Sequence, residues 1–311
     1  MLIITGTIAY DYIMDFPGKF AEHILPNQLH NINLSFIVNT FDKRRGGTAG
    51  NVSYTLGLLK TSNLLFSTAG KDFAEYKKAF KKLPSVDLSQ VVVDKTKFTA
   101  TGFAMTDKTN NQIWGYFYGA AESIVALSLR DVVQKDSLVL VGPSGATGSM
   151  SLVRQCVVTN IPYMFDPGFI LTQISDDELV YGVTHAAYII GNDYEIKVLQ
   201  ERVTDWSSIV KNKTVITTLG ETGAVINNGK ETYTIAAVSP KMVVDPTGAG
   251  DAWRAGFLAG LERKYDVQTS GQMGSVAASF ALEKYGTQEH TFTQKQFIDR
   301  YQQSFGRIIK I

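Results

Sequence analysis

The chain has 311 residues, of which 44% are hydrophobic and 19% charged, so it can bury a sizeable core and its composition excludes a disordered protein. The 30 basic and 29 acidic residues leave a net charge of +1, which excludes the strongly basic surface of a typical nucleic-acid-binding protein. The single cysteine, Cys156, excludes an internal disulfide and a thiolate metal cluster.

The N-terminus has no basic region before its short apolar run at residues 2–4, so we expect no signal peptide. No apolar run approaches the ~20 residues that a membrane-spanning helix requires. From these features we expect a cytoplasmic protein without nucleic-acid or membrane partners.

Predicted strands and helices alternate along the chain. Apolar, β-branched runs predict buried strands at 2–5, 64–68, 138–141, 163–165, 187–190 and 215–219. Helical patterns follow at 49–59, 74–83, 151–159, 195–201 and 251–263, and then at 267–282 and 294–305. This alternation indicates an α/β fold in which helices flank a central, mostly parallel sheet that binds ligands at the carboxyl ends of its strands. We expect one such domain over residues 1–311.

Two regions depart from this pattern and predict a small antiparallel sheet inserted into the core. Residues 31–39 alternate strictly, which is typical of a strand with one apolar face. Residues 99–106 and 112–118 flank a polar turn at 107–111 and predict a hairpin. Together with the segment near the N-terminus, the inserted sheet is expected from about residues 8–16, 30–40 and 98–118.

The predicted sheet carries more aromatic side chains than one solvent-facing surface normally exposes. They are Phe36, Phe103, Trp114, Tyr116, Phe117 and Tyr118. Two explanations remain open. The sheet acts as a lid over a ligand, which we prefer, or it packs against a second subunit and makes a homodimer.

A Gly-Ala-Gly loop at residues 248–250 opens an amphipathic helix. Its glycines leave backbone N–H groups free to converge, and the helix N-terminus adds partial positive charge, so the loop predicts a phosphate site. Asp251 in the first turn would repel a phosphate, unless it accepts a proton from a hydroxyl that attacks that phosphate. A glycine turn capped by an acid is the structural alternative.

The glycine pair Gly46-Gly47 opens another predicted helix. Paired glycines allow close approach by a small ligand, and Asn51 offers both a donor and an acceptor.

Two more motifs follow predicted strands in the second half of the chain. Asn192 and Glu195 lie one turn apart after the strand at 187–190, a spacing that suits a hydrated Mg²⁺ and equally a capping box. The glycine-rich turn from Thr218 to Gly223 either contacts a nucleotide phosphate or simply joins two strands.

Competing motifs are absent from the sequence. No P-loop pattern occurs, and Trp253 stands where a dinucleotide-binding loop needs its third glycine. The four histidines show no metal-ligand spacing.

In this order, and preceded by Asp11, the motifs resemble the ribokinase family, also called the PfkB carbohydrate kinases, over nearly the whole chain. Residues 245–258 are close to the family's C-terminal signature, and the glycine pair with Asn51 is similar to its N-terminal one. The resemblance implies a ribokinase-like fold and ATP-dependent transfer of the γ-phosphate to a primary hydroxyl of a sugar or nucleoside.

The resemblance also implies roles by position. The catalytic residues would be Asp251 as base, with Gly248, Ala249 and Gly250 as the anion hole. The substrate-binding residues would be Asp11, Gly46, Gly47 and Asn51. The ATP-binding residues would be Asn192, Thr218, Gly220 and Gly223, with Glu195 holding Mg²⁺ through water, and Asp245 and Thr247 holding a monovalent cation such as K⁺.

Residues 3–11, 16–20 and 110–112 resemble prokaryotic adenosine kinase-like members of the family. An aromatic lid suits stacking on a purine, so the 5′-hydroxyl of adenosine is the expected acceptor. One alternative is a kinase of a free sugar or sugar phosphate, with Lys43, Arg44 and Arg45 meeting a substrate phosphate. Another is a catalytically silent regulator that binds a nucleotide or sugar, against which the intact Asp251 argues.

Overall fold

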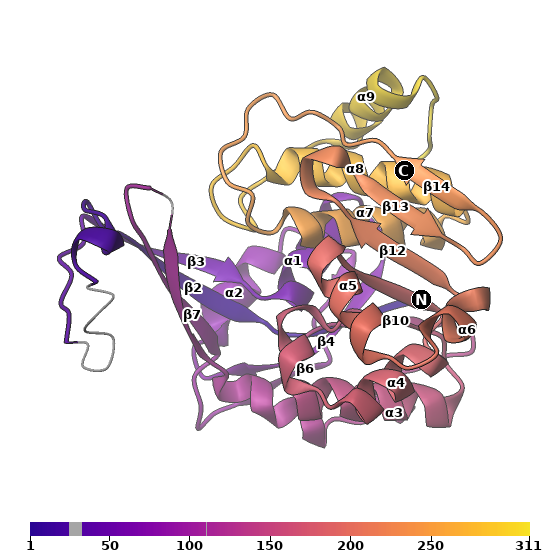
Figure 1. The fold of residues 1–311 in the computed structure, drawn as a ribbon, viewed down its shortest axis with the longest axis horizontal. Helices are drawn as coiled ribbons and strands as arrows, with labels where there is room; N and C mark the ends of the chain where they lie inside the picture. The colour runs from indigo at the N-terminus through magenta and orange to yellow at the C-terminus, as the bar shows by residue number, and fades with distance from the viewer. Residues whose placement is uncertain (25–32, 110) are drawn as a thin grey trace.

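The computed structural model describes residues 1–24, 33–109 and 111–311. It contains a large α/β core, from one side of which a smaller sheet projects (Figure 1).

The large sheet forms the centre of the core. Its strands, in spatial order, are β14 (Thr232–Ile235), β13 (Ala224–Asn227), β12 (Thr214–Thr218), β11 (Tyr188–Asn192), β10 (Tyr163–Phe165), β9 (Leu138–Val141), β1 (Leu2–Thr5), β4 (Asn63–Gly70) and β5 (Val86–Asp87), with β6 (Val91–Asp94) also paired to β4. The strands from β12 to β5 run parallel, whereas β13 and β14 are antiparallel additions at one edge.

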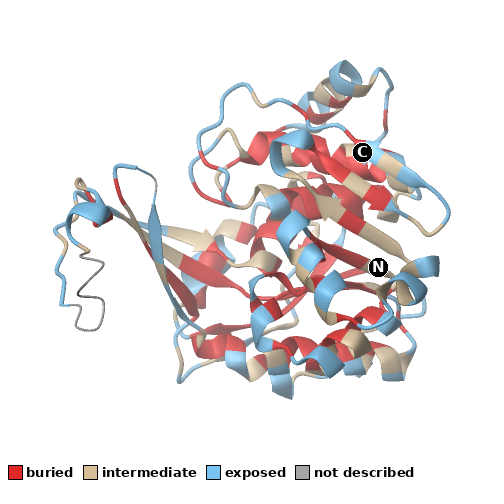
Figure 2. Cartoon of the chain, viewed as in Figure 1, coloured by how far each residue is buried: buried red, intermediate tan, exposed pale blue. Residues whose placement is uncertain are grey.

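Helices cover both faces of this sheet. The helices are α1 (Thr48–Leu58), α2 (Phe73–Phe80), α3 (Ala146–Thr159), α4 (Asp176–His185), α5 (Asp193–Arg202), α6 (Trp206–Ile209), α7 (Ala249–Glu262), α8 (Val267–Ala281) and α9 (Gln294–Phe305). Successive strand residues point to opposite faces, so Ile4 packs in one apolar cluster with α1, α7 and α8, while Ile3 packs in another with α3, α4 and α5. The buried residues accordingly lie in the strands of the large sheet and in the helices packed on it (Figure 2).

The smaller sheet, which we call the lid sheet, has the strand order β3 (Thr40–Gly46), β2 (Ala9–Asp15), β7 (Ala100–Thr106) and β8 (Gln112–Phe117). Its outer pairs β2–β3 and β7–β8 are antiparallel, and the central pair β2–β7 is parallel. The hairpin predicted at 99–118 is confirmed.

The predicted strand at 31–39 is wrong for residues 33–39, and residues 31 and 32 lie outside the described chain. Strand β2 ends at Asp15, whose partner is Thr40, so residues before 40 have no strand to pair with. The third lid strand is instead β3, which has no apolar alternation, since it is an edge strand open to solvent and four of its seven residues are charged. Phe36 packs outside the sheet, against Phe16 and Phe20.

Most other predicted elements agree with the structure to within two or three residues. Helix α3 begins at Ala146, five residues before the predicted start, because the small residues Gly148 and Ser149 are buried in the core and continue the helix there. None of the helices in the described ranges combines the length and apolar character needed to cross a bilayer.

Candidate functional site

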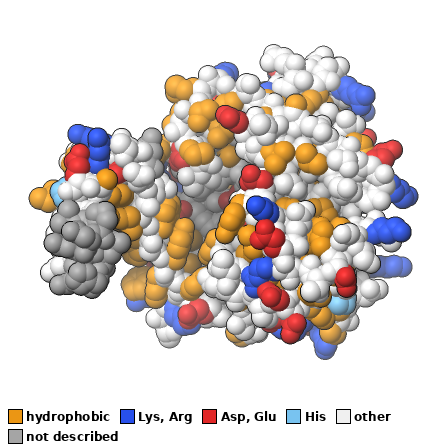
Figure 3. Space-filling model, viewed as in Figure 1, with side chains coloured by type: hydrophobic (Ala, Val, Ile, Leu, Met, Phe, Trp, Pro, Cys, Tyr) orange, Lys and Arg blue, Asp and Glu red, His pale blue; other side chains and the backbone are white. Residues whose placement is uncertain are grey.

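Two adjoining cavities lie between the lid sheet and the core. One has a volume of about 440 Å³ and the other about 220 Å³, and both are lined by Asp11 and Trp114 from the lid sheet and by Thr247 and Thr287 from the core. The hollow is visible between the two parts of the molecule in Figure 3, where apolar side chains border it. The smaller cavity also contains Asp251, so the sequence motifs converge at this place.

Asp251 lies in the first turn of α7 and is held by a chain of hydrogen bonds. Asn51 on α1 donates from Nδ2 to Asp251 Oδ2 at 2.7 Å. Gln288 Nε2 donates to Asn51 Oδ1 at 2.9 Å, which fixes the orientation of the Asn51 amide. Because only one oxygen of Asp251 is used in this way, its other oxygen is available to a ligand.

Asp11 on β2 faces the same space. A Cβ atom on Gly46 would overlap Asp11 Oδ2, so glycine at this position leaves room for the carboxylate in its present orientation. No side chain or backbone group in the described part of the chain hydrogen-bonds to the Asp11 carboxylate. Asp11 is therefore free to accept hydrogen bonds from the hydroxyl groups of a ligand.

Both carboxyl groups bind protons more tightly than usual. Burial, followed by the nearby charge of Asp251, raises the pKa of Asp11 to about 6. Burial also raises the pKa of Asp251 to about 6, although Arg254 and the Asn51 hydrogen bond oppose the shift. An acid with a pKa just below neutrality can accept a proton at neutral pH and release it again.

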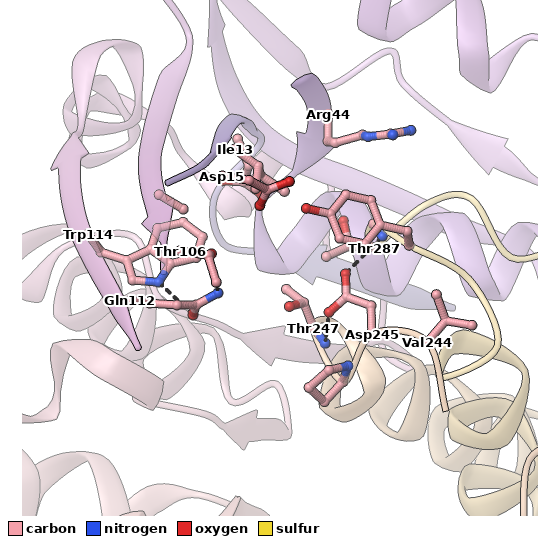
Figure 4. Close-up of a pocket in the computed structure, with 15 residues that line it drawn as sticks. Ile13, Asp15, Arg44, Thr106, Gln112, Trp114, Val244, Asp245, Thr247 and Thr287 are labelled. Carbon is pink, nitrogen blue, oxygen red and sulfur yellow. Dashed lines mark hydrogen bonds between the residues drawn. The ribbon is translucent and has the colours of Figure 1, made fainter. Parts of the chain in front are cut away.

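The loop before α7 is shaped for an anion. Gly248, the N-cap residue, has φ +78°, a left-handed conformation that favours glycine. The Ala249 N–H donates to the Pro246 carbonyl at 3.2 Å, whereas the N–H groups of Gly248 and Gly250 have no acceptor in the described chain and are free for an anion. Asp245 anchors this loop, since its Oδ1 accepts from the Thr247 N–H and its Oδ2 from the Gly286 N–H, each at 2.9 Å. In Figure 4 Asp245 and Thr247 face Trp114 across the larger cavity.

The second group of predicted residues lies at the carboxyl ends of β11 and β12. Asn192 and Thr218 are direct neighbours in the sheet. Asn192 and Glu195 form a capping box at the start of α5, with Asn192 Oδ1 accepting from the Glu195 N–H and Glu195 Oε2 accepting from the Asn192 N–H. The structural explanation of their spacing therefore holds, and each side chain keeps one polar atom for other partners.

The glycines of the neighbouring turn differ from one another. A Cβ atom on Gly223 would overlap the carbonyl oxygen of Ile235, so this glycine is required by strand packing. Gly220 has open space around it and is free to approach a ligand.

These donors suit a hydrated cation rather than a protein cage. In the described ranges no cluster of three or more histidine, cysteine or acidic side chains could hold a metal ion. Glu195 offers one free carboxylate oxygen, and Mg²⁺ characteristically uses one or two carboxylates together with water and phosphate oxygens. The residues present therefore fit a Mg²⁺ ion that arrives with a phosphorylated ligand.

Sequence reasoning missed several residues of the site. Arg254, one turn after Asp251, makes a buried ion pair with Asp166, and its isolated charge within an apolar helix was a signal. Gln288 gave no signal, because its contact with Asn51 spans 237 residues of the chain. Phe169, an aromatic residue just after β10, lines the smaller cavity.

Five aromatic residues line the smaller cavity, and three of them stack in a row that joins the lid sheet to the core. Trp114 and Tyr116 on β8 stack with centroids 5.4 Å apart, and Tyr116 stacks on Phe169 at 5.6 Å. Their planes are nearly parallel, at 6° and 12°. Tyr116 and Phe169 remain 59% and 48% exposed, which leaves ring surface for a planar ligand.

Asp251→Asn is expected to stabilise the fold at pH 7.5. Its pKa is raised from 3.8 to about 6 on folding, so the ionised carboxylate destabilises the folded state at neutral pH, and this cost disappears as the pH falls through 6. We expect a gain in the free energy of unfolding of about 1–2 kcal/mol, less than the full value of a two-unit shift because the group borders a cavity. Urea unfolding at pH 7.5 and pH 5 measures it.

The gain should shrink at pH 5, where the wild-type carboxyl group is itself largely protonated. Asp131→Asn, at an exposed aspartate outside the cavities, is the control and should change stability little at either pH. A gain equal at both pH values would contradict the raised pKa.

Comparison with known proteins places these features in a family. A model of the pfkB family of carbohydrate kinases matches residues 10–294. A nucleoside kinase from Methanocaldococcus jannaschii is 28% identical over 301 residues, covering 95% of this chain and 94% of that protein. The structure of Burkholderia thailandensis nucleoside kinase in complex with inosine is 33% identical, covers 100% of both chains and has a TM-score of 0.89.

The same Burkholderia enzyme in complex with ADP-inosine is 35% identical, covers 100% of this chain and 98% of that one, and has a TM-score of 0.87. The ribokinase-like α/β fold with its lid, expected from the motifs, is confirmed. The chain belongs to the pfkB family of carbohydrate kinases.

Proposed function

We propose that this protein is an ATP-dependent nucleoside kinase that phosphorylates the 5′-hydroxyl of a purine nucleoside, with adenosine as the substrate. The observation that carries the proposal is the position of Asp251. This carboxylate lies at the N-terminus of α7, beside the anion loop 248–250, and faces Asp11 beneath the aromatic rings of the lid sheet. Nucleoside kinases are among the relatives that match the chain over nearly its whole length.

In the proposed reaction Asp251 accepts the proton of the acceptor hydroxyl while the new bond between that oxygen and the γ-phosphorus forms. The bond from the γ-phosphorus to the bridging oxygen breaks, and ADP leaves with the electron pair. The N–H groups of Gly248 and Gly250, and that of Ala249 once it leaves the Pro246 carbonyl, stabilise the charge on the transferring group. Asn51 holds Asp251 in place, and Asp11 accepts hydrogen bonds from the sugar hydroxyls.

ATP would lie along the carboxyl ends of β11 and β12, with its phosphates directed toward α7. Asn192, Thr218 and Gly220 border this route, and the Burkholderia relative binds ADP together with inosine. Gly223 would not contact ATP but allows this turn to pack closely against the carbonyl of Ile235. A Mg²⁺ ion held by Glu195 through water would neutralise phosphate charge.

A monovalent cation such as K⁺ would bind near Asp245 and the Thr247 carbonyl. Asp245 is 8% exposed, and its carboxylate accepts from two backbone N–H groups, which carry no charge to balance it. A bound cation there would hold the anion loop in place.

The cavity chemistry favours a nucleoside over a sugar phosphate. Lys43 and Arg45 form ion pairs with Glu75 and Glu289 on other elements, so their charges are already balanced without a substrate phosphate. Arg44 lines the larger cavity but is paired with Asp42. The same cavity is lined by the carboxylates Asp11, Asp15 and Asp245. An additional phosphate would be repelled, whereas an uncharged nucleoside would not.

Asp251→Asn should remove turnover while ATP is still bound. The amide keeps the shape of the side chain and can still accept a hydrogen bond from Asn51, but it cannot take up the hydroxyl proton. We expect a fall in kcat of about 10²–10⁴-fold. Coupled-assay kinetics and titration with ATP measure the two effects.

A substrate panel tests the acceptor. Adenosine, inosine, guanosine, cytidine, ribose and fructose are each supplied with ATP and Mg²⁺, and we expect adenosine to give the highest kcat/KM. A higher kcat/KM for inosine would show that hypoxanthine, rather than adenine, is the preferred nucleobase. Turnover of ribose equal to that of the nucleosides would overturn the nucleoside assignment. Full activity in Asp251→Asn would overturn the mechanism.

Phe169→Ala should raise the KM for adenosine about tenfold and leave the KM for ribose unchanged. The reason is that stacking on an aromatic ring is worth about 1–3 kcal/mol per base. Phe98→Ala, which removes a similarly exposed ring that does not line the cavities, serves as the control. Equal effects on adenosine and ribose would show that Phe169 does not contact the base.

We also propose that the chain forms a homodimer through the outer face of the lid sheet. The rings of Tyr12, Phe41 and Phe103 stack on this face, which is opposite to Asp11, with centroids 5.4 Å apart. Phe41 is 62% exposed and Phe103 is 45% exposed, an arrangement suited to a second copy of the sheet. In this proposal each explanation of the lid aromatics refers to a different face of the sheet.

A further inference from the structure

Arg254 lies on the same side of α7 as Asp251, one turn further along. Its helical neighbours Ala252, Trp253 and Ala255 are buried and apolar, and its own side chain is only 9% exposed. Side chains on a helix lean toward the N-terminus, so the guanidinium lies beside the first turn. Arg254 Nη1 is 3.0 Å from the position that a Cβ atom on Gly250 would occupy.

Asp166, which follows β10, binds this guanidinium from one side through two hydrogen bonds. Arg254 Nε donates to Asp166 Oδ2 at 2.5 Å, and Nη2 donates to Oδ1 at 3.0 Å. The pair is buried, with Asp166 1% exposed. Removing two charges from water costs several kcal/mol, and apolar residues of similar volume often give equal stability. Stability alone therefore does not account for the pair.

The geometry leaves one nitrogen of Arg254 unused. Nε and Nη2 are occupied by Asp166, and within the described chain no group accepts a hydrogen bond from Nη1. Because the guanidinium is planar, the fork with Asp166 fixes the direction of Nη1, which lies beside Gly250 in the anion loop. Its two N–H donors therefore lie beside the anion loop without an acceptor in the described chain.

We propose that Arg254 is a catalytic residue that donates from Nη1 to the transferring phosphoryl group, and that Asp166 is the positioning residue that orients it. The proposal rests on the phosphoryl transfer proposed above. Arg254 makes and breaks no covalent bond. It neutralises charge on the phosphoryl oxygens while Asp251 takes the hydroxyl proton, as an arginine supplied within the same chain does in other phosphoryl-transfer enzymes.

The charges around Asp251 give a second readout. Burial raises the pKa of Asp251, Arg254 opposes that rise, and Asp166 and Glu195 reinforce it. Asp11 also faces Asp251 from β2. Removal of the guanidinium should therefore raise the pKa of Asp251 further above 6 and move the acid limb of the kcat/KM profile to higher pH.

The test uses Arg254→Lys, Arg254→Gln and Asp166→Asn in the full-length protein. Lysine keeps a charge but cannot hold Asp166 and a phosphoryl oxygen together. We expect Arg254→Lys to lower kcat about 10²–10³-fold, with the KM for nucleoside unchanged. Arg254→Gln should do so at least as strongly and shift the acid limb upward. Asp166→Asn keeps the guanidinium but loosens it, and should cost about tenfold in kcat.

Arg263→Lys is the matched control. Arg263 follows the same helix, is partly buried and donates to Thr61 and to the carbonyl of Leu59, outside both cavities. Its conservative substitution should leave kcat, the nucleotide affinities and the pH profile unchanged. Thermal melting identifies the variants that fold. If an Arg254 variant does not fold, Asp166→Asn still tests the proposal.

Nucleotide titration distinguishes this proposal from the proposed function. Wild-type protein should bind the β,γ-imido analogue of ATP more tightly than ADP, and Arg254→Lys should lose most of that preference. Loss of the preference in a protein that phosphorylates no nucleoside would overturn the proposed function and support the contact. A folded Arg254→Lys variant with wild-type kcat, pH profile and nucleotide preference would overturn the role of Arg254, whatever the acceptor.

Discussion

The site depends on one polar contact between two buried helices, the hydrogen bond from Asn51 on α1 to Asp251 on α7. The two residues are 200 positions apart in the sequence, and the helices that carry them pack against each other in the core. A half-buried carboxylate at this place costs folding free energy, as its raised pKa shows. The cost is limited because Asn51, Arg254 and the N-terminus of α7 all present positive or donor groups to it.

This contact is coupled to the lid sheet through two further side chains. Gln288 Nε2 donates to both Asn51 Oδ1 and the hydroxyl of Tyr76, and the Tyr76 hydroxyl donates to the carbonyl of Gly46 at the end of β3. The Asn51 amide is thus fixed at its oxygen, so its nitrogen must point toward Asp251. A displacement of β3 would alter the position of Tyr76 and, through Gln288, the orientation of Asn51. The lid sheet and the proposed base are therefore mechanically linked.

The sequence predicted the features that depend on local pattern. Buried parallel strands are covered on both faces, so β9 and β10 appear as continuous apolar runs that are found from the sequence alone. Strand β3 could not be found in this way. It lies at the edge of the lid sheet, where its side chains are exposed to solvent and can be charged. The contacts Asp166–Arg254 and Gln288–Asn51 join residues 88 and 237 positions apart, and only the folded topology brings them together. The Asn192–Glu195 spacing was compatible with a cap and with a ligand, and only the structure shows the cap.

The two carboxylates of the site explain how one pair can serve both binding and proton transfer. In the proposed reaction Asp11 must stay ionised to hold the sugar hydroxyls while Asp251 changes its protonation state. Burial and the charge of Asp251 together raise the pKa of Asp11. When Asp251 accepts the proton it becomes neutral, and its part of that repulsion disappears. Asp11 is then a stronger acid than before, so the proton has less tendency to move to it, and the sugar remains held while the phosphoryl group arrives.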